Sequence, residues 1–232
     1  MLELRNVHVS YDKSKIINGV DLQIQTSEKI CLLGRNGVGK TTLLKSIMGL
    51  LPVTEGSIHF NGENITKKKT YQRSKMGMAY VPQGREIIPM LSVKDNLLLG
   101  CMEHDYANRD RLLEEVLDYL PGLKEHLGRK GGVLSGGQQQ QLAIGRALMS
   151  RPKVILLDEP SEGIQPNIVH EISRILKRIS EEKQIAILIV EQNLEFAAKV
   201  TDRFIVMEKG AIIDRGDFEH VPMEQIKKHL VL

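Results

Sequence analysis

A glycine-rich segment from Gly34 to Thr41 constrains the fold of this 232-residue chain more than any other feature. It reads Gly-Arg-Asn-Gly-Val-Gly-Lys-Thr and follows the apolar run Ile30–Leu33, which has the character of a buried strand. Glycines let the backbone turn tightly, and the pattern is typical of a loop between a strand and a helix. This order indicates an α/β fold with the loop at the carboxyl edge of a parallel sheet.

Further strands are indicated by short apolar runs that alternate with helix-like segments. The runs that fit buried strands are Ile30–Leu33, Met78–Val81, Val154–Leu157, Ile185–Val190 and Phe204–Met207. Their alternation with helices predicts a largely parallel sheet with helices on its faces. One of these helices is expected to begin at Gln165-Pro166, with proline at its first position.

The first part of the chain has a different pattern. Its apolar runs are short, closely spaced and separated by turns that contain asparagine, aspartate or glycine. These runs are Leu2–Leu4, Val7–Val9, Val20–Ile24 and Ser57–Phe60. The spacing predicts an antiparallel sheet packed beside the main one.

Strand patterns vanish between Gln83 and Leu134, and helix patterns replace them. Helices are expected at Ser92–Leu99, where Ser92 can cap the helix, and at Arg109–Tyr119. This segment is therefore predicted to be a helical insertion into the α/β core.

The predicted organisation is one domain built from two parts. Residues 1–82 and 150–232 form the core with the antiparallel sheet, and residues 83–149 form the insertion. A Pro-Gln-Gly turn and Gly131-Gly132 flank the insertion's helices. Because both connections are flexible, we expect the insertion to move as a unit.

The segment Gly34–Thr41 matches the pattern of a phosphate-binding loop. In such a loop the backbone N–H groups turn inward around phosphates, Lys40 reaches the β and γ phosphates, and the Thr41 hydroxyl can bind Mg²⁺. The predicted nucleotide-binding positions are Gly34, Arg35, Asn36, Gly37, Val38, Gly39, Lys40, Thr41 and Thr42. The alternative, a glycine-rich turn with a solvated lysine, is disfavoured by the strand before the loop and the helix after it.

Two carboxylates end the strand-like run Val154–Leu157. Asp158 and Glu159 would lie at the carboxyl edge of the sheet, where ligands of such folds bind. Asp158 suits the role of holding Mg²⁺, and Glu159 can polarise the water that attacks a γ phosphate. In the alternative interpretation, the two acids only cap the turn that follows.

A second phosphate-binding surface is predicted at Ser135-Gly136-Gly137-Gln138, which follows Leu134. This serine and glycine turn opens a helix, so it presents a hydroxyl and several unpaired backbone N–H groups at the positive end of the helix dipole. Such an end binds anions.

Charge argues against a nucleic-acid partner. The formal net charge of +3 is too small for a domain that grips a phosphate backbone. The Lys67-Lys68-Lys69 run is interpreted as a solvated loop, with a phosphate or lipid headgroup site as the alternative.

The cellular compartment is indicated by cysteine usage and by the apolar runs. Cys31 and Cys101 lack the spacing of a zinc site or a disulfide framework, and Cys31 is expected in the core. The N-terminus has no leader pattern, and the apolar run Ile185–Val190 is far too short to span a bilayer. We expect a cytoplasmic protein that reaches a membrane through a partner.

These motifs, in this order, resemble the nucleotide-binding subunit of the ABC transporter family over essentially the whole chain. The order is Gly34–Thr41, Gln83, the signature Leu134–Gln138 and the strand that ends in Asp158-Glu159. The resemblance implies ATP and Mg²⁺ as cofactors, with Gln83 sensing Mg²⁺ and the γ phosphate. It also implies that Tyr11 stacks on adenine; taken alone, Tyr11 is better explained as a partly buried packing residue.

The resemblance further implies an ATP sandwich between two subunits. In this family the phosphate-binding loop of one subunit faces the signature of the other, so Ser135, Gly136, Gly137 and Gln138 would contact a nucleotide held by Lys40 of a second copy or of a close relative. Binding of ATP would close the dimer and hydrolysis would open it. The insertion would then pull on a permease in the membrane.

Two positions depart from the common family pattern. Gln192 stands where most members place a histidine that contacts the γ phosphate. Its amide can donate a hydrogen bond but carries no titrating charge, and with Lys40 and Glu159 it completes the predicted catalytic group. The loop Ser161–Gln165 has glutamine near the place of the usual aspartate, which leaves communication between subunits through this loop open.

The segments Tyr80–Pro89, Glu159–Pro166 and Val190–Asn193 are similar to the branched-chain amino acid and urea importer group. Within that group, Gly34–Val38 and Gly163–Pro166 favour the urea type. This likeness implies a peripheral subunit at the cytoplasmic face of the membrane. Its partners would be separate permease subunits and, indirectly, an external solute-binding protein.

The permease is expected to contact the insertion near Gly84–Met102, where four apolar residues lie beside Arg85 and Glu86. These are Ile87, Ile88, Met90 and Leu91. Alternatively, they only form the insertion's own core.

Two other functions compete with transport. One is an ABC ATPase that acts on nucleic acid or ribosomes, although such proteins carry a long coiled-coil insertion or two ATPase domains. The other is a binding module that holds ATP without hydrolysis, which is expected to lack the carboxylate found at Glu159.

Overall fold

A six-stranded sheet carries the glycine-rich loop. The computed structural model describes residues 1–11, 14–101 and 103–230. The strands lie in the order β10-β9-β3-β8-β7-β6, and all are parallel except β10, which is antiparallel to β9. They are β3 (Lys29–Leu33), β6 (Met78–Val81), β7 (Val154–Asp158), β8 (Ala186–Glu191), β9 (Arg203–Glu208) and β10 (Ala211–Asp217).

The five parallel strands confirm the apolar runs identified in the sequence, with β8 starting one residue after the run that begins at Ile185. Every residue of β3, β7 and β8 is buried, because helices or the second sheet cover both faces. Strand β10 was not predicted, since its sequence Ala-Ile-Ile-Asp-Arg-Gly-Asp lacks a buried run.

The second sheet is antiparallel, as predicted, with the order β2-β1-β4-β5. Its strands are β1 (Leu2–Tyr11), β2 (Ser14–Ile24), β4 (Glu55–Phe60) and β5 (Glu63–Asn64). The expectation of two separate strands at Leu2–Leu4 and Val7–Val9 was wrong. They form one strand with a register shift, where Asn6 takes φ 47° beside Gly56.

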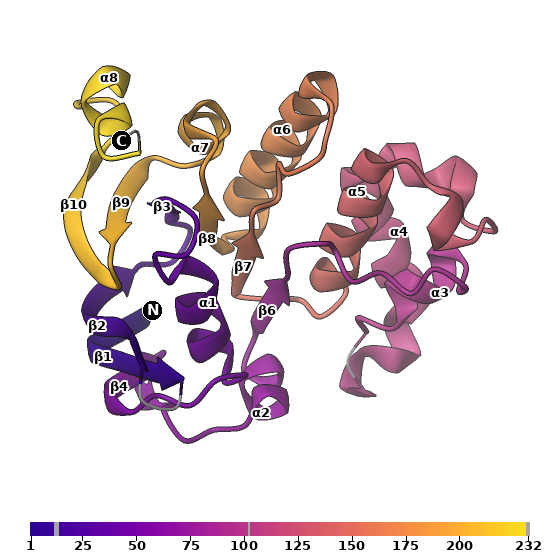
Figure 1. Ribbon diagram of the computed structural model, residues 1–232. Helices are drawn as coiled ribbons and strands as arrows, with labels where there is room; N and C mark the ends of the chain where they lie inside the picture. The colour runs from indigo at the N-terminus through magenta and orange to yellow at the C-terminus, as the bar shows by residue number, and fades with distance from the viewer. Residues whose placement is uncertain (12–13, 102, 231–232) are drawn as a thin grey trace.

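Helices lie on both faces of the main sheet and in the insertion. In Figure 1, α6 and α7 lie above the sheet, and α1 lies below it with the antiparallel strands. The core helices are α1 (Lys40–Met48), α2 (Thr70–Lys75), α6 (Pro166–Lys183), α7 (Leu194–Val200) and α8 (Met223–Lys227). Among residues 1–11, 14–101 and 103–230, no helix combines the length and apolar character that crossing a bilayer requires.

The insertion is helical, as expected. It contains α3 (Val93–Leu98), α4 (Arg109–Tyr119) and α5 (Gly136–Leu148), with 3₁₀ turns at Glu103–Asn108, Pro121–His126 and Gly131–Val133. The predicted cap of α3 is present, since Ser92 Oγ accepts a hydrogen bond from the N–H of Asp95 at 3.0 Å. Lysines 67–69 run along the surface ahead of α2, where Lys68 pairs with Glu63.

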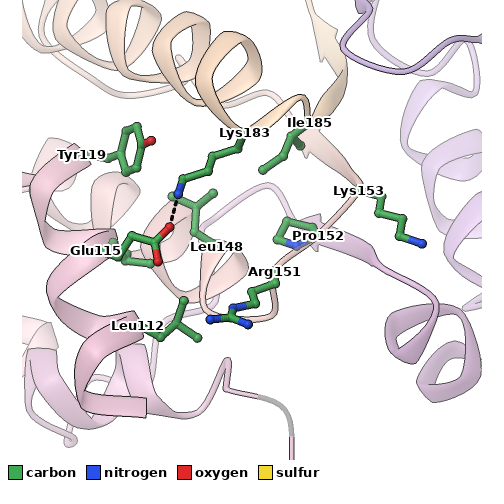
Figure 2. Close-up of a pocket in the computed structure, with 10 residues that line it drawn as sticks. Leu112, Glu115, Tyr119, Leu148, Arg151, Pro152, Lys153, Lys183 and Ile185 are labelled. Carbon is green, nitrogen blue, oxygen red and sulfur yellow. Dashed lines mark hydrogen bonds and ion pairs between the residues drawn. The ribbon is translucent and has the colours of Figure 1, made fainter. Parts of the chain in front are cut away.

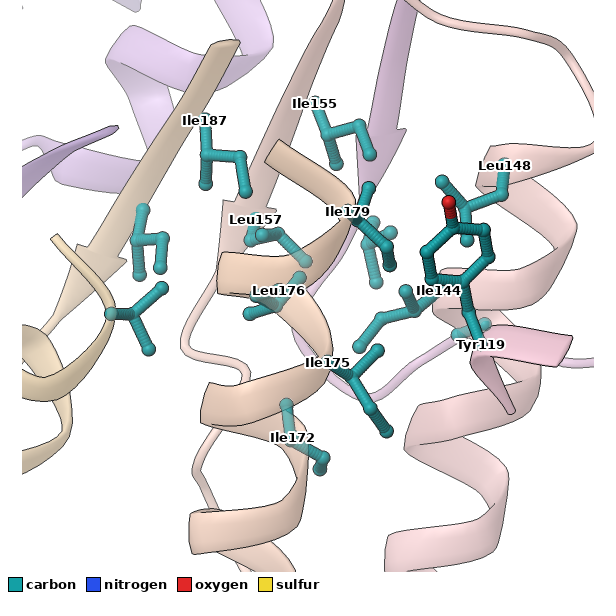
Figure 3. Packing of buried hydrophobic residues seen from close by; sticks show 14 of the residues in the cluster. Tyr119, Ile144, Leu148, Ile155, Leu157, Ile172, Ile175, Leu176, Ile179 and Ile187 are labelled. Atoms are coloured by element: carbon teal, nitrogen blue, oxygen red, sulfur yellow. The ribbon is translucent and has the colours of Figure 1, made fainter. Parts of the chain in front are cut away.

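One apolar cluster joins the insertion to the core. Figure 3 shows Tyr119, Ile144 and Leu148 from α4 and α5 packing toward Ile175 and Ile179 of α6. The cluster continues along the face of the sheet that α6 and α7 cover, where it includes buried residues of β3, β7 and β8, among them the predicted core residue Cys31. The insertion is thus attached through shared buried side chains as well as through its two chain connections.

A cavity of about 350 Å³ lies where α4 and α5 meet the starts of β7 and β8. Figure 2 shows the ion pair between Lys183 and Glu115 across it, with Leu112 and Ile185 among its apolar walls. The cavity is at the amino ends of the strands, whereas the glycine-rich loop follows the carboxyl end of β3. It therefore lies apart from the predicted phosphate site.

Arg73 anchors the far end of α1, the helix that begins at Lys40. Its guanidinium is 2% exposed and donates to Ser46 O at 2.8 Å and Ile47 O at 2.7 Å, in the last turn of α1. It also donates to Thr66 O and Lys68 O. Burial lowers the pKa of Arg73 to about 10, so the side chain remains a cation at neutral pH and satisfies carbonyls that the helix leaves without partners.

Replacing Arg73 by methionine keeps an unbranched apolar chain but removes the donors. We expect Arg73→Met to lower the free energy of unfolding by about 3 kcal/mol, because charged hydrogen bonds are lost and buried carbonyls remain unpaired. Urea unfolding followed by circular dichroism measures the change. Arg174→Met, at an exposed position of α6, is the matched control, and an equal effect of the two substitutions would contradict the anchoring role.

Candidate functional site

Loops at the carboxyl ends of four neighbouring parallel strands form the site. The glycine-rich loop follows β3, Gln83 follows β6, Glu159 follows β7 and Gln192 follows β8. Because β3, β8, β7 and β6 are adjacent in the sheet, these loops meet at one edge. This edge is where ligands bind in open α/β sheets.

The glycine-rich loop fits its place because its glycines have no side chains. A Cβ at Gly34 would lie 2.6 Å from Met207 O, and one at Gly39 would lie 2.8 Å from Ile17 Cδ1. Gly37 has open space, but its φ of 81° is one that other residues rarely adopt. The loop therefore leads into α1 with backbone N–H groups at the helix start, where anions bind.

The Lys40 ammonium is buried within this loop. Its Nζ donates to Gly34 O at 2.7 Å and Arg35 O at 3.0 Å, and it lies 3.6 Å from Glu159 Oε1. Burial lowers the pKa of Lys40, and the attraction of Glu159 and Asp158 opposes this effect. The ammonium thus links the loop after β3 to the end of β7.

Asp158 receives two hydroxyl groups, one on each oxygen. Thr41 Oγ1 donates to Oδ1 at 3.0 Å, and Tyr80 donates to Oδ2 at 3.1 Å. Burial raises the pKa of Asp158 although both hydrogen bonds favour the charged form, and burial beside Asp158 raises the pKa of Tyr80. Thr41 and Asp158 were each predicted to hold Mg²⁺, and the structure places their side chains in direct contact. The contribution of Tyr80 was missed, since only the adjacency of β6 and β7 places it there.

The carboxylate of Glu159 lies between two amides. Gln192 Nε2 donates to Oε1 at 2.9 Å, and Gln83 Nε2 lies 3.5 Å from Oε2. The stronger bond of Gln83 runs to Glu162 Oε2 at 2.9 Å. The structure therefore unites the predicted group of Lys40, Glu159 and Gln192, whereas Gln83 is bound to Glu162 rather than to the predicted metal ligands.

A cavity of about 570 Å³ beside the glycine-rich loop brings four of the predicted site residues together. Tyr11, Thr41, Gln83 and Asp158 all line it, and its size is in the range of small-molecule sites. The phenol of Tyr11 is exposed, so its face is accessible from this cavity. On the other side of the loop, Arg35 and Asn36 line a second cavity with Gln192.

Glu191 orients the loop after β8. Its buried Oε1 accepts the N–H of Ser161 at 2.9 Å, and its Oε2 accepts those of Gln192 at 3.0 Å and Asn193 at 3.1 Å. Burial raises the pKa of Glu191, and the three hydrogen bonds oppose this effect. Sequence reasoning missed this role, although a carboxylate that ends a buried apolar run is a signal for it.

The signature residues begin α5, as predicted. Ser135 Oγ accepts the N–H of Gln138 at 3.3 Å, and Gln138 Oε1 accepts the N–H of Ser135 at 3.0 Å, which forms a capping box. A Cβ at Gly137 would lie 2.4 Å from Ile168 Cγ2, so only glycine fits there. Gly136 lies beside the guanidinium of Arg85.

The two predicted phosphate surfaces do not meet within one chain. In Figure 1, α5 lies beyond β6 and α6, on the far side from α1. In the described part of the chain, no hydrogen bond or ion pair joins Ser135 through Gln138 to residues 34–42. Each surface therefore faces its ligand without help from the other.

The donor chemistry of this edge fits a polyphosphate with a small hard cation. Thr41 and Asp158 supply oxygen ligands, and Lys40 supplies a buried positive charge. Within residues 1–11, 14–101 and 103–230, no three histidine, cysteine, aspartate or glutamate side chains gather to hold a metal by themselves. One hydroxyl and one carboxylate are donors that suit Mg²⁺, which takes one or two carboxylates and completes its shell with water and phosphate oxygens.

Known proteins of similar sequence are named as ATP-binding proteins of transport systems. The family model for the ABC transporter matches residues 17–162. The chain is 38% identical over 213 residues to the high-affinity branched-chain amino acid transport ATP-binding protein BraG of Pseudomonas aeruginosa, covering 92% of this chain and 91% of BraG. It is 32% identical to a probable branched-chain amino acid transport ATP-binding protein, LivF, of Archaeoglobus fulgidus, covering 97% and 98%.

Solved structures confirm the fold class. The ADP conformation of the ATP-binding cassette MJ1267 superposes with a TM-score of 0.86 at 29% identity, covering 98% of this chain and 93% of that one. A dimeric post-hydrolysis cassette, MJ0796 bound to ADP and phosphate, has a TM-score of 0.83 at 26% identity, covering 94% and 98%.

The buried charge of Asp158 is expected to reduce stability. In Asp158→Asn the hydroxyls of Thr41 and Tyr80 keep partners, because a hydroxyl can either donate or accept. We expect the substitution to raise the free energy of unfolding at pH 7.5 by about 1 kcal/mol, measured by thermal unfolding without nucleotide or metal.

The pH dependence of this stability gain tests whether the buried charge of Asp158 is its cause. Because the pKa of Asp158 is raised in the folded state, the cost of its charge is fully present above that pKa and disappears as pH falls through it. The advantage of Asp158→Asn should therefore shrink as the pH is lowered from 7.5 toward the raised pKa of Asp158. Asp110→Asn, at an exposed position of α4, should show no gain. A loss of stability in Asp158→Asn at pH 7.5 would mean that the attraction to Lys40 outweighs burial.

Proposed function

The chain belongs to the ABC transporter family as an ATP-binding subunit that hydrolyses ATP, and we propose that it powers uptake of a small polar solute through separate permease subunits. The observation that carries this proposal is the contact of Lys40 and Gln192 with Glu159 at the carboxyl edge of the sheet. A buried cation and an oriented carboxylate beside a phosphate-binding loop are what transfer of a γ phosphate to water requires.

Each residue at this edge has a proposed role in that reaction. The loop N–H groups and Lys40 hold the β and γ phosphates, while Glu159 orients water and accepts its proton. Gln192 fixes Glu159 through its amide and can donate to the γ phosphate without changing charge with pH. Tyr11 stacks on adenine from its place in the same cavity.

Thr41 and Asp158 would hold Mg²⁺, which neutralises charge that develops on the phosphates. Their oxygens are already 3.0 Å apart, so the two ligands are preorganised on α1 and β7. Gln83 can join them only by releasing Glu162, which suits a residue that responds to the bound nucleotide.

A second subunit completes the site. Ser135 through Gln138 form an anion-binding helix start that faces away from the chain's own loop, so a two-fold dimer places it against the partner's nucleotide. The dimeric cassette with ADP and phosphate supports this arrangement.

The proposed permease surface lies at the border of core and insertion. Exposed Ile88, Met90 and Leu99 belong to the segment predicted from the sequence, whose last residue, Met102, lies outside the described residues. Tertiary structure adds Leu50 and Tyr71 from the core. Leu50 from the core and Leu99 from the insertion both line a cavity of about 410 Å³, so any motion of the insertion reshapes this surface.

The remaining predicted apolar residues, Ile87 and Leu91, are partly buried, and Ile87 packs against the core cluster. For these two positions the alternative interpretation as interior residues of the insertion is therefore the better one.

The solute is inferred only by class. The named relatives include proteins for branched-chain amino acids and, at 34% identity, the phosphonates import protein PhnC 2 of a Nostoc species. Urea, which Gly34–Val38 and Gly163–Pro166 favour, stays a prediction from the sequence. We place the subunit at the cytoplasmic face of the membrane, with an external solute-binding protein as an indirect partner. Purifying the complex and measuring which solute that protein retains decides among these solutes.

Glu159→Gln tests the proposed reaction. The amide keeps the size of the side chain but cannot accept the proton of water, so we expect turnover to fall by about 100-fold or more. ATP and Mg²⁺ should then hold the variant as a dimer. Phosphate release and light scattering after size exclusion measure the two effects.

Glu181→Gln, exposed on α6, is the matched control and should hydrolyse ATP normally. A Glu159→Gln protein that binds ATP yet stays monomeric would contradict the sandwich. One that hydrolyses ATP at the normal rate would contradict the role of Glu159.

Leu99→Glu tests the permease surface. The side chain is exposed, so the fold and the ATPase activity of the isolated subunit should be unchanged. Transport by the reconstituted complex should fall by about tenfold, because a charge replaces an apolar contact. Ile213→Glu, exposed on β10, is the control; equal losses in both variants would reject this surface.

A further inference from the structure

The chain adopts a left-handed backbone at three consecutive residues immediately after Gln83. Gly84, Arg85 and Glu86 have φ values of 77°, 70° and 44°. This conformation is ordinary for glycine but uncommon for arginine and glutamate, and it persists only where surrounding contacts hold it. The contacts that hold this turn come from α5 and from the loop after β7.

Arg85 is held by α5 at two points. Its Nη1 reaches Gln139 Oε1 at 3.5 Å, and its carbonyl accepts a hydrogen bond from Arg146 Nη2 at 3.3 Å. Gln139 and Arg146 lie about two turns apart on α5 and therefore on the same face.

The same guanidinium also holds the loop after β7. Its Nη2 donates to Glu162 O at 3.1 Å, and Gln83 Nε2 donates to the carboxylate of the same glutamate at 2.9 Å. A Cβ on Gly136 would lie 3.2 Å from Nη1, and one on Gly163 would lie 3.7 Å from Nη2. The guanidinium thus sits between the first signature glycine and this loop.

We propose that Arg85 is a positioning residue that fastens the signature end of α5 to the loop Ser161–Gln165. When a subunit binds its own nucleotide, Gln83 releases Glu162. The link through Arg85 then shifts the signature residues of that same subunit, which contact the nucleotide bound by the partner subunit. A planar guanidinium can bind two elements at once, which a lysine ammonium does not reproduce. This inference rests on the ATP sandwich of the proposed function.

Mixed dimers distinguish an effect of Arg85 on the signature of its own chain from an effect on the site that contains Glu159 of its own chain. One chain of the dimer carries Glu159→Gln. Only the nucleotide site that contains Glu159 of the other chain can then hydrolyse ATP. The signature residues of that active site belong to the chain with Glu159→Gln. Different affinity tags allow the mixed dimer to be isolated. Arg85→Ala is placed either on the chain that supplies the signature or on the chain that supplies Glu159.

We expect Arg85→Ala to lower kcat by about tenfold on the signature chain and by less on the other chain, with unchanged affinity for ATP, because displaced phosphate ligands slow the reaction. Equal effects, or a larger effect on the chain with Glu159, would overturn the proposal. Arg111→Ala on the signature chain, at an exposed position of α4, should leave kcat unchanged.

Two further variants separate positioning from folding. Arg85→Gly relieves the left-handed backbone, so thermal stability should be kept while kcat still falls; normal turnover would overturn the role of Arg85. Arg85→Lys should remain slow, because one ammonium cannot replace the bridge, and full rescue by lysine would overturn it as well. If Glu159→Gln chains with intact Arg85 form no ATP-dependent dimer, the ATP sandwich itself is wrong. If they dimerise but Arg85→Ala lowers kcat equally on either chain, only the proposed role of Arg85 is wrong.

Discussion

The structure depends on a set of charges buried together at the ends of β3 and β7. Lys40 lies 3.6 Å from Glu159, and Asp158 lies next to them with both oxygens bound by hydroxyl groups. Each charge would be costly to bury alone, and each is tolerated because partners from other strands reach it. The loops that follow β3, β6, β7 and β8 must therefore meet at the carboxyl edge of the sheet.

The rest of the core supports that edge. Strands buried on both faces hold the loops in place, and Arg73 secures the end of α1 opposite Lys40. The edge itself is not arranged for greatest stability, since burial raises the pKa of Asp158 and of Glu191 and lowers that of Lys40. Such opposition between stability and chemistry is expected where a protein must bind and release a charged ligand.

The insertion is joined to this edge in two physically different ways. Apolar packing between α5 and α6 attaches it along a broad surface, which resists separation but allows small sliding. Hydrogen bonds of Gln83 and Arg85 to Glu162 attach it at a point next to the carboxylate of Glu159. A change at the nucleotide can therefore reach both the signature and the surface near Leu99 without unfolding either part.

Features with local causes can be predicted from the amino-acid sequence alone. The strand and loop before Lys40, the cap at Ser92, the capping box at Ser135 and the start of α6 at Pro166 all depend on residues a few positions apart. Resemblance to a family added the expected roles of Gln83 and Tyr11, which no local pattern implies.

Contacts between residues far apart in the sequence follow from the assembled fold. Thr41 and Tyr80 lie 117 and 78 positions from the Asp158 that they contact, and periodicity does not encode the order of strands that joins them. The same holds for Glu191 beneath Ser161 and for Arg85 beside Gly136. The spacing of apolar residues predicts strands and helices because each segment buries its own apolar side chains. The site instead depends on contacts between side chains of different strands and loops, and these contacts exist only once the sheet has assembled.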